Sequence, residues 1–281
     1  MENKLQAVSL DQQALAQQFH ALHGHEGTAL VLPNVWDAVS ARLMQRCGAL
    51  AIATTSGGVS WAHGYADGGA LPIAAYLATV REIARVVPLP LTVDLEDGYS
   101  DDAALVAANV CEFIAAGAVG INIEDGAGEP ELLMAKIAAI REQSAAMGLD
   151  LFINIRTDVY LRALVEKDKL AAETIRRADF YKRSGADGLF VPGLADLDVL
   201  RSISEVVGMP VNVMAVPGLA SVQQLAAHGA RRVSAGTALM QAVLASTVKL
   251  ANDMLVNGSV EGMFADSLGY GEVNALFPPA A

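Results

Sequence analysis

The chain has 281 residues, and 53% of them are hydrophobic, which is enough apolar material for one large domain or two small ones. Its 19 basic and 31 acidic side chains give a net charge of −12. This charge argues against nucleic acid or an anionic membrane as a partner, because both need a basic surface. A small anionic substrate is still compatible, since it needs only a local cation or a bound metal.

The two cysteines, Cys47 and Cys111, belong to no Cys-x-x-Cys or Cys/His cluster, so neither a zinc site nor a disulfide framework is expected. Both fall in segments of helical periodicity, where we expect them to be buried packing residues. The first 24 residues lack the basic start and apolar centre of a signal peptide, and no run of 18 apolar residues follows. These features predict a cytoplasmic protein without a membrane span.

Short apolar runs typical of buried strands alternate along the chain with segments of helical periodicity. A glycine precedes several of these runs, as expected for a residue that ends a helix in the left-handed conformation. Strands that alternate with helices pair in parallel through right-handed crossovers. The predicted strands cover residues 29–35, 50–56, 91–96, 120–125, 151–158, 188–193, 211–218 and 231–236.

Eight such units predict an α/β fold, a (β/α)8 barrel of the TIM type, as a single domain over residues 1–281. A doubly wound open sheet is the alternative, and it is disfavoured because no Gly-x-Gly-x-x-Gly follows the first strand. Residues 237–281 then form a long helix and an apolar helical tail. An apolar tail must cover some surface, so we expect it to pack on a neighbouring subunit of a homo-oligomer.

Polar residues stand where the predicted strands end, and in a (β/α)8 barrel these ends form the active site. Side chains alternate along a strand, so Asp94 and Glu96 share a face, and Glu124 follows on the next strand. Several carboxylates in one cleft need a counter-charge. Oxygen ligands without His or Cys favour Mg²⁺, with Mn²⁺ as the alternative. Further candidates at strand ends are Trp36, Ser56, Gly57, Gly58, Arg156 and Asn212.

Simpler interpretations compete with some of these candidates. Asp97, Asp101 and Asp102 resemble a capped helix start rather than metal ligands. Arg156 could serve only as a structural ion pair for the carboxylates. Packing and backbone hydrogen bonding would explain Trp36 and Asn212 equally well.

Two further features favour a structural interpretation. His63 lies in a loop, where a lone histidine is more often a surface residue than a proton donor. The segment SAGTALM, residues 234–240, could bind phosphate, but a glycine for tight strand–helix packing explains it better.

Five segments together resemble the isocitrate lyase/phosphoenolpyruvate mutase superfamily, and the resemblance extends roughly from residue 28 to residue 245. It implies a (β/α)8 barrel whose terminal helix is often exchanged between subunits. The segments are NVWDAVSARL (34–43), TTSGGVSWAHGYADGGALP (54–72), LTVDLEDGYSD (91–101), GINIED (120–125) and NIRTDVYL (154–161).

The resemblance also implies roles for single residues. Asp94 would bind Mg²⁺ most directly, and Glu96 and Glu124 would hold its water ligands. The backbone N–H groups of Ser56 and Gly57 would bind the substrate carboxylate. The family's loop aspartate matches Asp67, and its strand-5 arginine, a cationic partner for substrate oxygens, matches Arg156. The shared chemistry is an enolate of pyruvate or a related oxo acid, stabilised by Mg²⁺ as a Lewis acid.

Two departures from the family's motifs limit which of its reactions we expect from this chain. Lyases of the superfamily carry a Lys-Lys-Cys-Gly-His type loop after the fourth strand, and its Cys is the general acid/base; here residues 125–136 contain neither Cys nor His. At the end of the sixth strand, the lyases have Glu and the mutase His, but this chain has Pro192.

These departures predict a Mg²⁺-dependent enzyme that cleaves a C–C bond of a small 2-oxo or 2-hydroxy dicarboxylic acid, similar to oxaloacetate decarboxylase. The alternatives are a P–C bond enzyme acting on phosphonopyruvate or phosphoenolpyruvate and a 2-oxo acid binding protein with little turnover.

Overall fold

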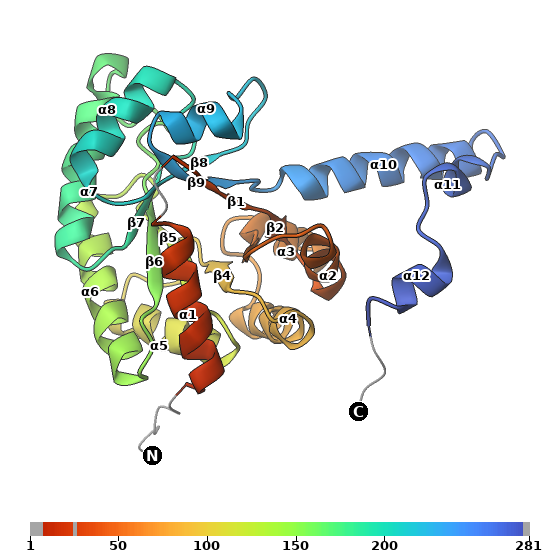
Figure 1. Ribbon diagram of the computed structural model, residues 1–281, viewed down its shortest axis with the longest axis horizontal. Helices are drawn as coiled ribbons and strands as arrows, with labels where there is room; N and C mark the ends of the chain where they lie inside the picture. The colour runs from red at the N-terminus through yellow and green to blue at the C-terminus, as the bar shows by residue number, and fades with distance from the viewer. Residues whose placement is uncertain (1–7, 25–26, 278–281) are drawn as a thin grey trace.

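Nine strands form one sheet in which all hydrogen-bonded neighbours are parallel (Figure 1). The computed structural model describes residues 8–24 and 27–277, so the first seven and last four residues of the predicted domain lie outside the described part. The sheet order is β1-β9-β8-β7-β6-β5-β4-β3-β2. The strands are β1 (Leu30–Leu32), β2 (Asn34–Val35), β3 (Ile52–Thr54), β4 (Leu91–Asp94), β5 (Gly120–Glu124), β6 (Phe152–Arg156), β7 (Gly188–Phe190), β8 (Val211–Met214) and β9 (Ala230–Ser234).

The first predicted strand, residues 29–35, is divided into β1 and β2 at Pro33. Proline has no N–H group to give to a strand ladder. β1 pairs with β9 and β2 pairs with β3, so the chain changes partners at this proline and the sheet nearly closes on itself. The nine strands therefore occupy the eight positions of a TIM-type barrel, and the predicted (β/α)8 fold is confirmed.

Helices alternate with the strands and surround the sheet (Figure 1). Local sequence sets their ends: the Asp196 side chain caps α8 at its start, and Gly208, with φ of 58°, ends it. The helices are α1 (Leu10–Leu22), α2 (Ala38–Arg46), α3 (Ser56–Ala62), α4 (Ile73–Val86), α5 (Ala103–Ala115), α6 (Pro130–Ala146), the 3-10 helix η1 (Lys167–Lys169), α7 (Leu170–Arg183), α8 (Leu197–Val207), α9 (Val222–Ala227), α10 (Ala238–Leu255), α11 (Gly262–Ala265) and α12 (Tyr270–Asn274).

Helix α1 packs across the end of the barrel where the strands begin. Phe19 of α1 lies edge-on to Phe152, the first residue of β6, with ring centroids 5.3 Å apart. Gly120, the first residue of β5, makes room for this contact, because a Cβ there would lie 2.8 Å from the Phe19 ring. Both aromatic side chains are buried, so this end of the barrel has an aromatic floor.

Helix α10 extends away from the barrel, and the chain then turns back through α11 to α12 (Figure 1). The returning segment contacts α2: Arg42 Nε donates to the carbonyl of Leu276 over 2.7 Å, and Arg46 forms an ion pair with Glu272. Along this arm several large apolar side chains are exposed, among them Val248 at 60% and Phe264 at 70%.

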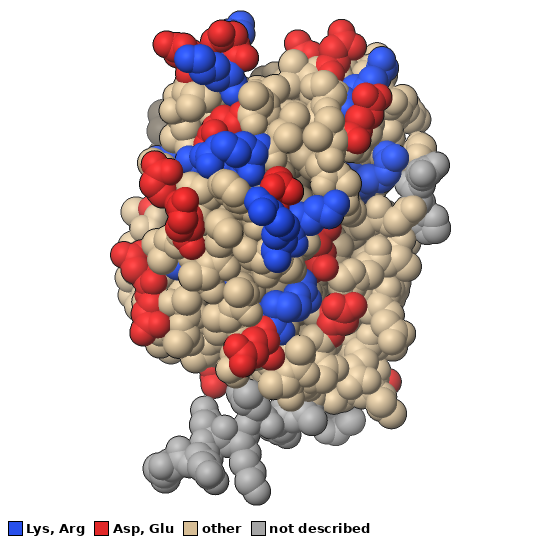
Figure 2. Space-filling model, turned by 90° about the vertical axis from the view of Figure 1, so that its left-hand side faces the viewer, with Lys and Arg blue, Asp and Glu red and all other residues tan. Residues whose placement is uncertain are grey.

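The face formed by α6, α7 and α8 carries acidic and basic side chains in alternation (Figure 2). On α7, for example, Arg176 pairs with Glu173 and Arg183 pairs with Asp179. The net negative charge is therefore not concentrated on this face. Within the described residues, none of the helices combines the length and apolar character needed to cross a bilayer.

Candidate active site at the carboxyl ends of the strands

Three charged side chains come from the last residues of adjacent strands: Asp94 ends β4, Glu124 ends β5 and Arg156 ends β6. In the ladder Glu124 lies opposite Arg156, and Asp94 lies opposite Asn122 of β5. All three charged residues are partly buried. The parallel register therefore brings the predicted carboxylates and the predicted cation to one mouth of the barrel.

Arg156 is held between two carboxylates. Its Nη1 lies 2.8 Å from Glu124 Oε2, and its Nε lies 2.7 Å from Asp158 Oδ1. Burial disfavours the charged guanidinium, but Glu124 and Asp158 outweigh burial and raise the pKa of Arg156. Asp158 is completely buried. Arg156 is thus a structural ion-pair partner, as the simpler interpretation holds, and it also lies at the predicted site.

Asp94 is connected to the turn that begins α3. The Ser56 hydroxyl and backbone N–H donate to Asp94 Oδ2 over 2.9 and 3.3 Å. Helix α3 starts here because the Thr55 side chain caps it. A Cβ on Gly57 would lie 2.9 Å from Asp67 Oδ2, so glycine permits the close approach of the Asp67 loop. The structure therefore brings Ser56, Gly57 and Asp67 together with Asp94.

Glu96 also belongs to this cluster, but it lies in the loop after β4 and not on the strand, as the alternation of side chains had predicted. Strand β4 ends at Asp94, and Glu96 has a left-handed backbone with φ of 51°. Burial, followed by repulsion from Asp67 and Asp94, raises the pKa of Glu96 to about 7. Tyr99, which also has a positive φ of 65°, donates its hydroxyl to Glu96 Oε1 over 3.5 Å. Two such residues in one short loop are typical of functional sites.

The cluster has more negative than positive charge. Burial, opposed by Arg156 and assisted by Asp94, raises the pKa of Glu124 to about 8. Of the four carboxylates in the cluster, those of Asp67, Asp94, Glu96 and Glu124, Glu124 forms an ion pair with Arg156, whose guanidinium Asp158 also engages.

This donor set fits Mg²⁺. Within residues 8–24 and 27–277, no group of three carboxylate, His or Cys side chains converges closely enough to bind a metal directly. Mg²⁺ commonly binds through one or two carboxylates and keeps several waters, so it does not need such a group. The excess negative charge favours a cation, and Asp94 lies among the other carboxylates.

The remaining predicted substrate contacts lie at two levels. A Cβ on Gly58 would lie 3.3 Å from the Cβ of Trp36, so these two residues adjoin the turn at Ser56. Asn212 lies deeper inside the barrel, where it accepts from Asn154 Nδ2 over 3.2 Å and donates to Ser234 Oγ over 3.1 Å. The structure does not bring Asn212 to the carboxylates, and its contact with substrate stays a prediction.

Asp125 is a supporting residue that the sequence did not single out. Its buried carboxylate accepts hydrogen bonds from Tyr181 OH (2.6 Å), Thr157 Oγ1 (2.8 Å), Arg177 Nη1 (2.9 Å) and the Asp158 backbone N–H (3.0 Å). These bonds attach the ends of β5 and β6, which carry Glu124 and Arg156, to α7. The signal was available in principle, because Arg177 and Tyr181 are four residues apart on one face of a helix.

Several secondary expectations can be compared with the structure. Asp102 caps α5, as predicted. His63 is an exposed loop residue whose Nε2 lies 2.8 Å from Thr79 Oγ1. The turn in residues 234–240 uses its Ala235 and Gly236 amides to donate to Asn34 Oδ1. A Cβ on Gly236 would approach the Met214 sulfur to 2.8 Å, which supports the packing explanation for this glycine.

The expectation for the cysteines was half right. Cys111 is buried in α5, as predicted. The prediction for Cys47 was wrong: α2 ends at Arg46, and Cys47 is an exposed C-cap residue. The helix ends there because Gly48 follows with φ of 90°, which turns the chain away from the helical surface.

Comparison with known proteins agrees with this fold. The sequence profile of phosphoenolpyruvate phosphomutase matches residues 19–255. An uncharacterized protein of Mycobacterium tuberculosis is 40% identical over 226 residues, which is 78% of this chain and 81% of that protein. The 2-methylisocitrate lyase of Salmonella typhimurium is 30% identical over 201 residues, 69% of this chain and 68% of the lyase.

A solved structure from Burkholderia cenocepacia J2315, assigned provisionally as a lyase or mutase, superposes with a TM-score of 0.86. It is 33% identical, and the match covers 95% of this chain and 96% of that one. The chain therefore belongs to the phosphoenolpyruvate phosphomutase family, within the isocitrate lyase/phosphoenolpyruvate mutase superfamily, whose members are lyases and mutases acting on C–C or P–C bonds.

Proposed function

We propose that this protein is a Mg²⁺-dependent lyase that cleaves a C–C bond of a small 2-oxo dicarboxylic acid, with oxaloacetate decarboxylation as its simplest reaction. The observation that carries the proposal is the mouth of the barrel. There Glu124 forms an ion pair with Arg156, Asp94 accepts a hydrogen bond from Ser56, and repulsion from Asp94 helps to raise the pKa of Glu96. A bound Mg²⁺ would supply Lewis-acid stabilisation for the negative charge that develops on the 2-oxo oxygen.

The chain's own groups have distinct tasks in this proposal. The amides of Ser56 and Gly57, at the start of α3, bind the carboxylate next to the 2-oxo group. Arg156, fixed by Glu124 and Asp158, orients the substrate oxygens. Trp36 and Gly58 line the same side of the mouth, and Asn212 supports it from below. Asp67, on the adjoining loop, is positioned to exchange a proton with substrate or water.

The proposed reaction requires few general acid–base groups. The bond between C3 and C4 of oxaloacetate breaks, CO₂ leaves, and its electron pair forms the enolate of pyruvate, which then takes a proton. The loop between β5 and α6 spans only residues 125–129, and both cysteines lie outside it, Cys111 on α5 and Cys47 directly after α2. A reaction whose last step accepts a proton from water or a weak acid fits this arrangement better than one that requires a loop cysteine.

Relatives support the C–C assignment. The oxaloacetate decarboxylase of Rhodopseudomonas palustris is 30% identical over 222 residues, which is 73% of each chain. The 2-methylisocitrate lyase named above supports cleavage of a larger 2-hydroxy diacid at the same site. A P–C bond reaction is the second candidate, because the matching family profile is that of a phosphomutase. Binding of a 2-oxo acid without turnover is the third.

The test is pyruvate release by purified protein with Mg²⁺, from oxaloacetate and from phosphonopyruvate in parallel, with subtraction of the metal-catalysed background. Asp94→Asn removes the proposed metal ligand. Asp101→Asn is the matched control, because this side chain is 89% exposed on the same loop. Turnover of oxaloacetate that depends on Asp94 supports the proposal.

The other outcomes reassign the site. Turnover of phosphonopyruvate alone would assign P–C bond cleavage to this site. Binding of oxalate without product from either compound supports a binding role. Equal turnover by wild type and Asp94→Asn would show that the site is wrong.

We also propose that residues 237–281 pack on a neighbouring subunit of a homodimer or homotetramer. An apolar hollow of about 450 Å³ lies on the outer wall beside β1 and the end of α2, with Val31, Met44 and Leu50 in its lining. Val31 and Leu50 are more than half exposed. Burial of the exposed apolar side of α10 in a partner's hollow would stabilise the contact by about 25 cal/mol per Å².

Sedimentation of the full chain tests this assembly. Wild type is expected to sediment as a dimer or tetramer and Val248→Glu as a smaller species, because a buried charge opposes the contact. Lys249→Glu, at the neighbouring position, is the control for a charge change on the same helix. A monomeric wild type contradicts the proposal.

A further inference from the structure

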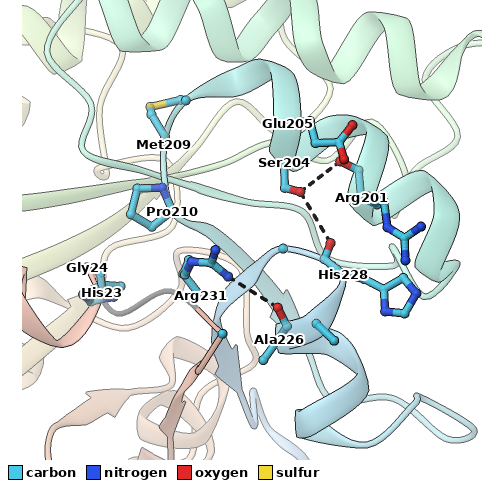
Figure 3. Close-up of a pocket in the computed structure, with 14 residues that line it drawn as sticks. His23, Gly24, Arg201, Ser204, Glu205, Met209, Pro210, Ala226, His228 and Arg231 are labelled. Carbon is cyan, nitrogen blue, oxygen red and sulfur yellow. Dashed lines mark hydrogen bonds between the residues drawn. The ribbon is translucent and has the colours of Figure 1, made fainter.

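A second concave region lies at the opposite end of the barrel, where β8 and β9 begin (Figure 3). It is a cavity of about 650 Å³ between α8 and the segment that joins α9 to β9. Small-molecule sites usually measure roughly 300 to 1,000 Å³. The carboxylates of the proposed active site stand at the other ends of the strands, so this cavity is separate from them.

The cavity contains arginines that have no carboxylate partner among the described residues. Most arginines in residues 8–24 and 27–277 lie within 4.0 Å of a carboxylate, and the exceptions are Arg42, Arg201, Arg231 and Arg232. Arg201 and Arg231 line the cavity, and Arg232 is the next residue on β9. In a chain with a net charge of −12, a concentration of unpaired guanidinium groups in one hollow points to an anionic ligand.

The Arg231 side chain is oriented by the backbone. Arg231 Nη1 donates to the carbonyls of Ala230 and Ala226 over 3.1 and 3.4 Å, which fixes the guanidinium without neutralising it. Figure 3 shows Arg201 extending from α8 toward the ring of His228. The lining contains one carboxylate, Glu205, against two guanidinium groups. The described lining is therefore net positive.

A buried histidine adds a second chemical requirement. His23, only 3% exposed, lines the cavity, and its Nε2 has no hydrogen-bond partner among the described residues. Its Nδ1 lies 2.7 Å from the carbonyl of Phe19, so Nδ1 carries the proton and Nε2 is left as an acceptor. Burial, assisted by Arg232, lowers the pKa of His23 to about 3, so the ring is neutral at pH 7. An unpaired acceptor favours a ligand that carries a hydroxyl donor.

Taking the cations and the acceptor together, we propose that this cavity binds a small phosphorylated metabolite that also carries a hydroxyl group. The phosphate would lie against Arg201 and Arg231, and the hydroxyl would donate to His23 Nε2. Phosphate is preferred to carboxylate because three oxygens and up to two negative charges satisfy two guanidinium forks. The concave shape favours a small molecule over a protein segment.

Calorimetric titration of the full-length, EDTA-treated protein at constant ionic strength tests the proposal. The probes are glycerol 3-phosphate, inorganic phosphate and malonate. We expect glycerol 3-phosphate to bind most tightly, and we expect its affinity to fall about tenfold or more in the Arg201→Gln/Arg231→Gln double variant. His23→Phe is expected to reduce the preference for glycerol 3-phosphate over inorganic phosphate.

Matched variants locate the binding. Arg162→Gln removes an exposed guanidinium on the loop after β6, at the other end of the barrel, and should leave the affinity unchanged. Unchanged affinity in the double variant, or loss in Arg162→Gln alone, would place the anion at the barrel mouth and overturn the proposal. Tighter binding of malonate would overturn the phosphate class, and equal affinity for inorganic phosphate would overturn the hydroxyl contact. Absence of binding by all three probes would overturn the site.

Discussion

The two ends of the barrel differ in the sign of the charge that lacks a partner. At the carboxyl ends of the strands, Glu124 and Asp158 enclose Arg156, and the pKa values of Glu96 and Glu124 are raised for lack of positive charge. At the amino ends, Arg201 and Arg231 lie in a hollow without a carboxylate partner among the described residues. We therefore propose a cation for the first end and an anion for the second.

This difference shows that cavity size alone would have misplaced the active site. The 650 Å³ hollow lies at the amino end, whereas the chemistry-bearing groups lie at the carboxyl end. In a parallel barrel, side chains at the carboxyl ends of strands converge on one mouth, and enzymes of this fold use that mouth. Charge composition and position along the strands are the better guides, and substitutions at the two ends can test the contrast.

The largest expected effect is that of Asp94→Asn at the mouth. The amide cannot replace the carboxylate as a Mg²⁺ ligand, and the Ser56 hydroxyl loses its charged hydrogen-bond partner. We expect kcat/KM for the cleaved oxo acid to fall about 10³-fold or more, the range seen when electrostatic stabilisation is removed. Steady-state kinetics and Mg²⁺ titration check this. A fall in kcat/KM of less than about tenfold would contradict this contrast between the two ends of the barrel.

Asp125→Asn tests the support beneath the mouth. It leaves Arg177, which is nearly buried, with Glu173 as its remaining described carboxylate partner, and it weakens four hydrogen bonds. Loss of one partner of a buried ion pair costs about 3–5 kcal/mol of unfolding free energy. Urea unfolding followed by circular dichroism measures this cost. Glu166→Gln removes an exposed partner of Lys169 and is the control, with an expected change under about 1 kcal/mol.

The pH dependence of the unfolding free energy tests whether the carboxyls at the barrel mouth lack a compensating positive charge. The carboxyls of Glu96 and Glu124 have pKa values of about 7 and 8 in the folded chain, against 4.5 when unperturbed. Between these values the folded state binds more protons than the unfolded state, so the unfolding free energy falls as pH rises from about 5 to 8. After allowance for solvent screening we expect a loss of roughly 2 kcal/mol in metal-free protein.

Saturating Mg²⁺ should reduce this pH dependence, because a bound cation favours the ionised carboxyls. Urea midpoints measured at several pH values, with EDTA or with Mg²⁺, provide the comparison. Stability that rises with pH in EDTA would contradict the assignment.

The smallest effect is expected at the amino end. Arg201 is exposed and forms no ion pair with a described residue, so Arg201→Gln should change the unfolding free energy by less than about 0.5 kcal/mol. Thermal unfolding in phosphate-free buffer measures it. A loss above 1 kcal/mol would show that Arg201 serves the fold rather than a ligand.

Periodicity predicted the barrel well, because a buried parallel strand is a continuous apolar run and a glycine in the left-handed conformation follows several of the helices. The strand ends were less well predicted. Residues 151–158 were assigned to one strand, but β6 ends at Arg156, and Thr157 and Asp158 instead bond to the Asp125 carboxylate. Tertiary hydrogen bonds of this kind leave no local pattern in the sequence.

Within the candidate site, Asp94, Glu124 and Arg156 could be placed from the sequence because each ends a strand whose neighbours follow in order. Glu96 was predicted by alternation, but its left-handed backbone depends on the loop and not on a propensity of glutamate. The arginine hollow was not predicted at all, since Arg201 and Arg231 are far apart in sequence and only the fold brings them to one cavity.

Closure of the barrel at Pro33 has a consequence for biosynthesis. Leu30 of β1 pairs with Arg232 of β9, so one edge of β1 has no partner until most of the chain has left the ribosome. At ordinary rates of about 5–20 residues per second, roughly 10 to 40 seconds separate the synthesis of the two strands. An unpaired edge readily captures other strands, so the nascent chain would depend on chaperones or on early docking of α1 until β9 emerges.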